Sequence, residues 1–495
     1  MDNSMQDSAV NNSISVDHPD SAAVPRTEAV KVSRELLDFI RRSPTPYHVA
    51  SGFAKMLEKA GFEHLKEGQP WHLQRGGSYY VTRGGSSLIA FRIPDAAPAR
   101  FQITAAHSDS PAFRLKTDPD IPCAGHYICL NVEKYGGAIL SSWLDRPLSI
   151  AGRVMVQEAD GIRERLVHFD RDLVLIPNVA IHMNRQINDG YAYHVQKDML
   201  PLFGDETSAG RLQELIACEL SVRPEQILSS DLLLYNRTPG TVWGAQEEYI
   251  SSPKLDDLQC AYSAIRALIG SGSDSGSSVG SNVGSSIGSS VGSSVGSASF
   301  RTDSICVAAV FDNEEVGSRT ARGADSTFLE DTLQRIWLLT GSGASSPEES
   351  YRMAVSGSFL ISADNAHAVH PHHPDKADPV HRPLLNKGPV IKFCASQKYT
   401  TDAFSAAVFQ TVCSRAGVPW QVFHNHSDQA GGSTLGNISN AHVSLHAADI
   451  GLAQLSMHSP YETAGILDTA FLIRALEEYY RTAIRIGDDR VSFLP

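Results

Sequence analysis

The sequence predicts an α/β fold in which helices flank a mixed sheet and a β-rich domain is inserted into the chain. Three observations carry this prediction. Wholly apolar runs, of which Ile305–Phe311 is the clearest, are typical of strands buried on both faces inside a helix-covered sheet. Segments with helical spacing of apolar residues alternate with such runs before residue 116 and after residue 244. Residues 116–244 instead show short alternating segments broken by turn residues, as in β-rich domains.

The elements expected in the first part of the chain follow from local patterns. The first 28 residues are polar and mildly acidic, and we expect a disordered tail that is not a signal peptide. A helix is expected over Ala29–Arg42, because its apolar residues recur at near-helical spacing and Ser43–Pro46 would end it. Gly77–Pro94 holds two strand-like runs divided by a glycine pair, which predicts a hairpin. Phe101–Ala106 is a further short apolar strand, and it leads directly into His107.

The second part of the chain returns to alternating helices and strands. We expect helices at Leu255–Ile269, Thr327–Leu339, Ala403–Ala416 and Glu462–Arg481. We expect strands in the segments SFLISAD (358–364), PVIKFC (389–394), WQVFHN (420–425) and HVSLHA (442–447). Gly270–Ser299 repeats a GSSV-like tetrapeptide and would bury too little apolar surface to become ordered, so we expect a flexible surface loop. The chain therefore divides into a tail (1–28), an α/β domain (29–115 and 245–495) and an inserted β-rich domain (116–244).

Composition narrows the classes of function. The formal net charge is -13 and no basic run occurs, which argues against a protein that binds nucleic acid or anionic membranes. No apolar run approaches the length of about 20 residues that spans a bilayer. The seven cysteines are scattered and form no C-x-x-C pair, a usage that favours a reducing, cytoplasmic compartment.

Side chains that bind metals stand at five boundaries of the expected elements. Two adjacent acids, Glu314 and Glu315, follow the buried strand at 305–311, and neighbouring side chains at a strand end should face different partners. The other four places are His107 with Asp109, Asp256 with Asp257, Asp364, and His458. Each place alone has an ordinary explanation, such as a turn or a helix start. Together, two histidines and several carboxylates at element ends form the ligand set of a two-metal hydrolytic site.

Six segments occur in the order that is typical of the M18 family of metallo-aminopeptidases, the aspartyl aminopeptidase group. They are AAHSDSPAFRLK, SPKLDDL, FDNEEVGS, SADNAHAVHP, GGSTLG and QLSMHSPYE. The resemblance extends from about Ala29 to Arg485 and is interrupted by the Gly/Ser repeat. It implies a zinc-peptidase-like fold and a dinuclear zinc enzyme that removes the N-terminal residue of peptides.

The resemblance also implies a role for each residue of the site. His107 and Asp364 would bind one of two Zn²⁺ ions, Glu315 and His458 the other, and Asp256 would bridge them. Glu314 would be the general base, which takes a proton from the attacking water and passes it to the leaving amine. Asp109 would hold the ring of His107 from behind and set its tautomer.

Further residues are implied for the substrate and for assembly. The segment IPNVAIHMNRQIN resembles the family segment whose histidine reaches a neighbouring subunit, so His182 would assist catalysis in a homododecamer. Lys392 and Tyr399 stand where the family binds the substrate, and the backbone at Gly431–Thr434 would bind an anion. An acidic first residue, Asp or Glu, is therefore the expected substrate. The sequence departs from many members at Asp257, where they carry asparagine.

Three alternatives remain open at this point. The chain would be a relative of the same family with neutral specificity, or another co-catalytic zinc amidohydrolase such as a deacylase. A third alternative, from a different functional class, is a catalytically inactive assembly or cargo protein that keeps the family's oligomeric shell. The complete ligand set argues against this last alternative, because an idle copy should have lost at least one of these residues.

Overall fold

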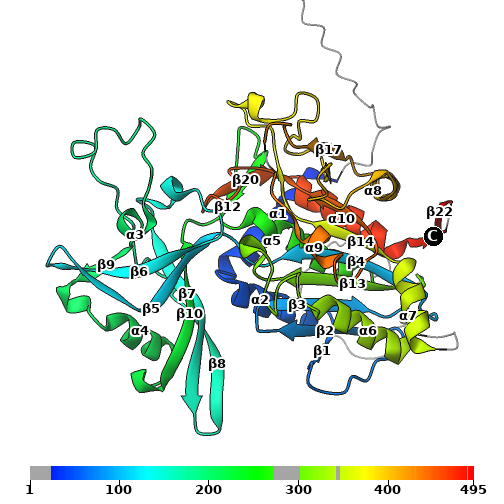
Figure 1. Ribbon diagram of the computed structural model, residues 1–495, viewed down its shortest axis with the longest axis horizontal. Helices are drawn as coiled ribbons and strands as arrows, with labels where there is room; N and C mark the ends of the chain where they lie inside the picture. Colours follow the sequence, from blue (N-terminus) through cyan, green and yellow to red (C-terminus); the bar gives the residue numbers. More distant parts are fainter. Residues whose placement is uncertain (1–23, 273–301, 342–345, 430, 488, 495) are drawn as a thin grey trace, which may run out of the picture.

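The chain folds into two lobes, one built on a nine-stranded sheet and the other on a six-stranded sheet (Figure 1). The computed structural model describes residues 24–272, 302–341, 346–429, 431–487 and 489–494. Residues 1–23 of the predicted tail and residues 273–299 of the predicted Gly/Ser loop lie outside the described residues. The prediction of an α/β fold with a mixed sheet is confirmed.

The nine-stranded sheet runs in the order β1-β2-β3-β13-β4-β14-β18-β16-β17. Its four central strands, β13, β4, β14 and β18, are parallel to one another, whereas β3 and β16 run antiparallel to them. The carboxyl ends of the central strands therefore meet at one edge, where open α/β sheets bind their ligands. The strands in chain order are β1 (Glu63–Leu65), β2 (Ser78–Arg83), β3 (Ser87–Arg92), β4 (Arg100–His107), β13 (Ser304–Phe311), β14 (Phe359–Ala363), β16 (Val390–Phe393), β17 (Gln421–His424) and β18 (His446–Gly451).

Helices cover both faces of this sheet because its central strands are apolar on both sides. In β13, Cys306 and Ala308 join the core beneath one set of helices, and Ile305 and Val307 join the core on the opposite face. The first face packs against α1 (Arg26–Arg42), α2 (Pro46–Lys59), α5 (Leu255–Gly270), α8 (Ala403–Ala416) and α10 (Asp468–Arg481). The second face packs against α6 (Phe328–Thr340), α7 (Pro347–Ser356) and α9 (Leu435–Ser439).

The six-stranded sheet of the second lobe is antiparallel and has its own core. Its order is β8-β7-β10-β5-β6-β9, and the short helices α3 (Val195–Asp198) and α4 (Arg211–Leu220) belong to the same segment. The sheet uses residues from Ala112 to Asn236, whereas the predicted insertion was 116–244. Its strands are β5 (Ala112–Cys123), β6 (Tyr127–Tyr135), β7 (Leu148–Glu158), β8 (Gly161–His168), β9 (Leu202–Asp205) and β10 (Ile227–Asn236).

Two smaller sheets complete the chain. A five-stranded sheet lies beside the first lobe in the order β11-β12-β20-β19-β15, and β21 pairs with β22 near the end of the chain. Their strands are β11 (Thr241–Trp243), β12 (Tyr249–Ser252), β15 (Ala366–His367), β19 (Ala453–Leu455), β20 (Glu462–Gly465), β21 (Ala483–Ile486) and β22 (Val491–Leu494).

Three expected elements differ from the structure at their ends. The first helix begins at Arg26 and so takes up the last residues of the expected tail. The expected helix Glu462–Arg481 is wrong in its first turn, because Glu462–Gly465 forms β20 and the helix begins at Asp468. The strand expected at 442–447 begins only at His446 and continues to Gly451.

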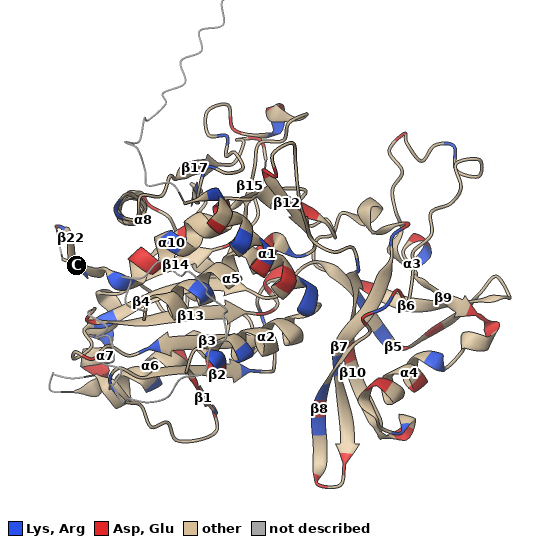
Figure 2. Cartoon of the chain, turned by 180° about the vertical axis from the view of Figure 1, so that it is seen from behind, with Lys and Arg blue, Asp and Glu red and all other residues tan. Residues whose placement is uncertain are grey.

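Charged residues of both signs are interspersed over the two lobes (Figure 2). Among the described residues, no helix combines the length and the apolarity needed to cross a membrane.

Candidate metal centre

Three central strands deliver polar side chains to one edge of the large sheet. His107 is the last residue of β4, and it lies opposite Phe311, the last residue of β13, in the parallel register. The acids Glu314 and Glu315 follow β13 in a single 3-10 turn, and Asp364 follows β14 directly. This convergence explains how residues more than two hundred positions apart in sequence come to face one another.

Asp256 lies at the centre of the cluster, at the start of α5. Its Oδ1 is 3.5 Å from Nε2 of His107, and its Oδ2 is 3.4 Å from Nε2 of His458. Nε2 of His458 is also 3.4 Å from Oε2 of Glu315. One carboxylate thus lies between two imidazoles that come from opposite ends of the chain.

Two groups of possible metal ligands share Asp256. The first contains His107, Asp256 and Glu315, and the second contains Asp256, Asp257 and Asp364. Within each group the ligand atoms lie within 4.8 Å of one another. Asp257, which stands beside Asp256 in the sequence but was given no role as a ligand, therefore belongs to the cluster. Its Oδ2 also accepts the backbone N–H of His107, at 3.2 Å.

The polar atoms of the cluster fit a bound cation. Asp256 Oδ1, Asp257 Oδ1 and Glu315 Oε1 are buried and have no hydrogen-bond donor among the described residues. Leaving carboxylate oxygens buried without a partner is costly, and a metal ion would remove that cost. Imidazole nitrogens together with carboxylate oxygens are ligands that zinc accepts.

Glu314, Glu315 and His107 all have raised pKa values in this buried cluster of carboxylates. Burial, followed by the neighbouring charges of Asp364 and Asp109, raises the pKa of Glu314 to about 8. Burial and the charge of Asp256 raise the pKa of Glu315 well above its usual value. Burial alone would lower the pKa of His107, but its contacts with Asp109 and Asp256 outweigh burial and raise it. A cation placed among these groups would reverse the shifts of the carboxylates.

Asp109 connects His107 to the glutamate turn. Its Oδ1 accepts the backbone N–H of Glu314 and its Oδ2 that of Glu315, both at 3.1 Å. The hydroxyl of Tyr135 donates to Oδ2 at 2.7 Å. The ring of His107 lies 3.1 Å from the backbone oxygen of Asp109 and 3.4 Å from its Oδ1. Asp109 is fully buried, so it holds both the ring and the turn in place.

Several residues that build this site were not predicted from the sequence. Glu462 accepts the backbone N–H groups of Asp256 and His458, at 3.0 and 2.8 Å. The carbonyl of Gly137, from the six-stranded lobe, lies 2.8 Å from Nδ1 of His458. Gly136 has φ +71°, and a Cβ there would lie 3.1 Å from Cβ of Glu315. The six-stranded lobe thus approaches the site closely. No sequence signal marked Gly136 or Gly137, and Glu462 was hidden inside an expected helix.

Lys392 and Tyr399, which were predicted to bind the substrate, lie close to each other, and Lys392 contacts Asp364. Nζ of Lys392 is buried, donates to the backbone oxygen of Asp364 at 2.7 Å and lies 3.8 Å from its Oδ2. The same Nζ lies 5.2 Å from the centre of the Tyr399 ring.

His182 is exposed, on a stretch of the six-stranded lobe that precedes α3. Gly431–Thr434 leads into α9, where the hydroxyl of Thr434 donates to Asp449.

Comparisons with known proteins place the chain in a family. The family model described as "Aminopeptidase I zinc metalloprotease (M18)" matches residues 39–283 and 283–480. A Clostridium acetobutylicum protein named probable M18 family aminopeptidase 2 is 40% identical over 459 residues, which cover 91% of this chain and 99% of that protein.

Solved structures agree with this assignment. Ape4, solved by cryo-EM in complex with Nbr1, is 34% identical with a TM-score of 0.84 over 92% of this chain and 86% of the other. The S. cerevisiae mApe1 dodecamer is 25% identical with a TM-score of 0.76 over 91% and 97% of the two chains. The chain therefore belongs to the M18 family of zinc metallo-aminopeptidases.

Proposed function

We propose that this enzyme holds two zinc ions and removes the N-terminal residue of peptides, with a preference for Asp or Glu. The observation that carries the proposal is the position of Asp256, whose two oxygens face His107 and His458 separately. A carboxylate whose two oxygens face different histidines is suited to bind one ion with each oxygen. His107 and Asp364 would hold one ion, and Glu315 and His458 the other.

The chemistry follows from the residues around this bridge. Bound zinc would supply Lewis acidity, which polarises the scissile carbonyl and makes the attacking water more acidic. Glu314 takes the proton of that water as the C–O bond forms and returns it to the leaving amine as the C–N bond breaks. Asp109 fixes the backbone of Glu314, so the base keeps its place while it gains and loses the proton.

Lys392 supports the preference for an acidic first residue. Burial alone would lower the pKa of Lys392, but Asp364 and Tyr399 outweigh burial and raise it, so the ammonium is charged when a substrate arrives. A buried cation beside the centre would attract the side-chain carboxylate of Asp or Glu. Neutral specificity within the family is the alternative, since Asp364 already balances part of this charge.

We also propose that the chain assembles as a homododecamer in the cytoplasm. The solved mApe1 dodecamer is the precedent for the assembly. Three large apolar side chains near His182 are exposed, namely Val179, Ile181 and Met183, and such a patch is typical of a surface that packs against another copy. His182 would then contribute to a neighbouring subunit's site. All seven cysteines are free thiols, the state that a reducing cytoplasm maintains.

The test is a substrate panel on protein of known zinc content. Asp-, Glu-, Leu- and Ala-amides report the specificity, and N-acetylated peptides report the need for a free amine. We expect Glu314→Gln to lose at least about a hundredfold in kcat, as is usual when a general base is removed. Glu330→Gln is the matched control, because Glu330 is a half-buried glutamate on α6 that accepts from Gln334 at 3.0 Å. Near-normal activity of Glu314→Gln would refute the role of the base, and equal turnover of N-acetylated peptides would favour a deacylase.

A further inference from the structure

The turn that carries Glu314 is held through the side chain of Asn313. Asn313 has φ +63°, a left-handed conformation that asparagine tolerates better than most residues. Its Nδ2 donates to the hydroxyl of Tyr135 at 2.9 Å, and its Oδ1 accepts from Thr320 at 2.7 Å and from Nη2 of Arg322 at 3.4 Å. The conformation of the turn thus depends on groups that approach from outside it.

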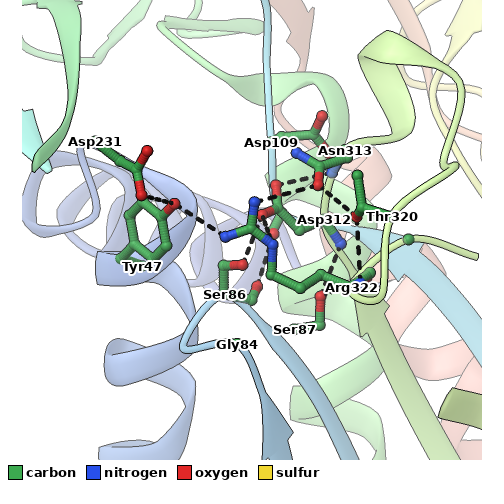
Figure 3. Close-up of polar contacts among 12 residues, drawn as sticks. Tyr47, Gly84, Ser86, Ser87, Asp109, Asp231, Asp312, Asn313, Thr320 and Arg322 are labelled. Carbon is green, nitrogen blue, oxygen red and sulfur yellow. Dashed lines mark hydrogen bonds and ion pairs between the residues drawn. The ribbon is translucent and has the colours of Figure 1, made fainter. Parts of the chain in front are cut away.

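Arg322 closes the loop that follows the turn. Its backbone oxygen accepts the N–H of Asp312 at 3.1 Å, so the two ends of the loop meet. Its side chain extends back across the loop (Figure 3), with Nε 3.5 Å from Oδ2 of Asp312. A third nitrogen, Nη1, donates to the hydroxyl of Tyr47 at 2.9 Å. The planar guanidinium therefore holds Asp312, Asn313 and Tyr47 with three different nitrogens.

Tyr47 connects this arginine to the six-stranded lobe. Its hydroxyl donates to Oδ2 of Asp231, on β10, at 3.2 Å. Nε of Arg153, on β7, binds the same oxygen at 2.7 Å. The ring of Tyr47 also contacts both guanidinium groups, with Arg153 4.5 Å and Arg322 5.6 Å from its centroid. Tyr47 is only 6% exposed, whereas the side chains of Arg153 and Arg322 are each 21% exposed, so these contacts are partly shielded from water.

The buried carboxylates near Arg322 explain why a cation is needed at this position. Asp312 is buried close to Asp109, so two carboxylates stand behind the glutamate turn. The cation of Arg322 faces Asp312, and Ser86 donates to the same Asp312 oxygen at 2.6 Å. Without that cation, repulsion between the two buried acids would act directly on the segment that leads into Glu314.

We propose that Arg322 is a positioning residue for Glu314, and that Tyr47 makes this positioning depend on the docking of the six-stranded lobe. The contacts run from Asp231 through Tyr47 and Arg322 to Asn313, and they end at the residue before the base. None of these side chains is required to touch the substrate. The inference rests on the proposed role of Glu314.

The experiment compares Tyr47→Phe with Tyr80→Phe. Tyr47→Phe keeps the ring but removes the hydroxyl that joins Arg322 to Asp231. Tyr80 is a matched control, because it is also buried, at 1% exposed, and its hydroxyl donates to Glu58 at 2.7 Å, away from the turn. We expect both variants to lose similar thermal stability, but only Tyr47→Phe to lower kcat, by about tenfold, since the lost bond joins a charged group. KM should stay within about twofold of wild type, because substrate contacts are unchanged.

Arg322 variants show whether the effects share one path. We expect Arg322→Met to lower kcat more than Tyr47→Phe does, and the double variant to lose no more than Arg322→Met alone. Arg322→Lys should also stay impaired, because an ammonium cannot hold three partners as a guanidinium does. Full activity of Arg322→Lys, or additive losses in the double variant, would overturn the proposal.

Glu314→Gln in the same assay separates this inference from the proposed function. If Glu314→Gln is inactive while Tyr47→Phe keeps a normal kcat at full zinc content, the inference alone fails. If Glu314→Gln is active, the proposed function fails, and the positioning of that residue fails with it.

Discussion

Replacing Asp109 by asparagine should weaken zinc binding without enlarging or shrinking the side chain. Asp109 uses both oxygens, one for the N–H of Glu314 and the other for the N–H of Glu315 and the hydroxyl of Tyr135. An asparagine has one acceptor oxygen, so its NH₂ group would face at least one of these donors. Hydrogen bonds to charged groups contribute about 1.5–3 kcal/mol each. The free energy of unfolding should therefore fall by about 1.5–6 kcal/mol, for one or two lost bonds.

The same substitution should also lower the zinc affinity, because Asp109 contacts the ring of His107 and the backbone N–H of Glu315. Loss of a group that orients metal ligands typically lowers affinity by about 10- to 100-fold. That loss corresponds to about 1.4–2.7 kcal/mol of binding free energy. The assay is competition for zinc with a chelator of known affinity, followed by the midpoint of urea unfolding on the same sample.

Asp468→Asn is the matched control for this experiment. Asp468 is also fully buried, and it accepts two backbone N–H groups, from Asn386 and Gly388, at 2.7 and 2.9 Å. It should lower stability by a similar amount and leave the zinc affinity unchanged. Zinc affinity of Asp109→Asn within about twofold of wild type, with stability lost as in the control, would refute the orienting role.

Four other outcomes follow from the structure. Glu462→Gln keeps one of the two acceptor oxygens that hold two proposed ligands, so zinc per chain after dialysis should fall below the wild-type value. In zinc-free protein, the raised pKa of Glu314, about 8, means that the folded state binds more protons than the unfolded state. The free energy of unfolding should therefore fall as the pH rises from about 6.5 to 8, a range in which histidines buried as neutral rings no longer oppose the trend. Saturating zinc should reduce the fall without removing it, because burial also raises the pKa of Asp468, outside the cluster, to about 7. A flat profile without zinc would contradict the reasoning. Lys392→Met should lower kcat/KM for Asp and Glu substrates at least about tenfold relative to Leu substrates, and an unchanged ratio would mean that another group selects the acid. Met183→Asp should shift the particle to smaller species in light scattering, because a charge would replace an exposed apolar side chain in the proposed contact.

The sequence was sufficient to predict the large sheet and the edge at which its polar residues gather. Apolar runs such as Ile305–Phe311 were informative, because a strand buried on both faces is a short continuous apolar run and this length suits a strand better than a helix. The first turn of the last long helix was wrong, since Glu462–Gly465 has no alternation strong enough to separate a four-residue strand from the helix after it. Tyr135 and Gly137 could not be found, because their contacts with the site arise only when one lobe packs against the other.

The order of these elements along the chain limits how the protein can be dissected. His107 ends the strand just before the six-stranded lobe begins, and Asp256 follows shortly after that lobe is complete. A version in which a short linker replaces the lobe would retain every proposed zinc ligand in its primary structure. It would nevertheless lack the phenol that binds Asp109 and the carbonyl that faces His458. Excision of the lobe should therefore yield a protein with all its ligands and an impaired centre.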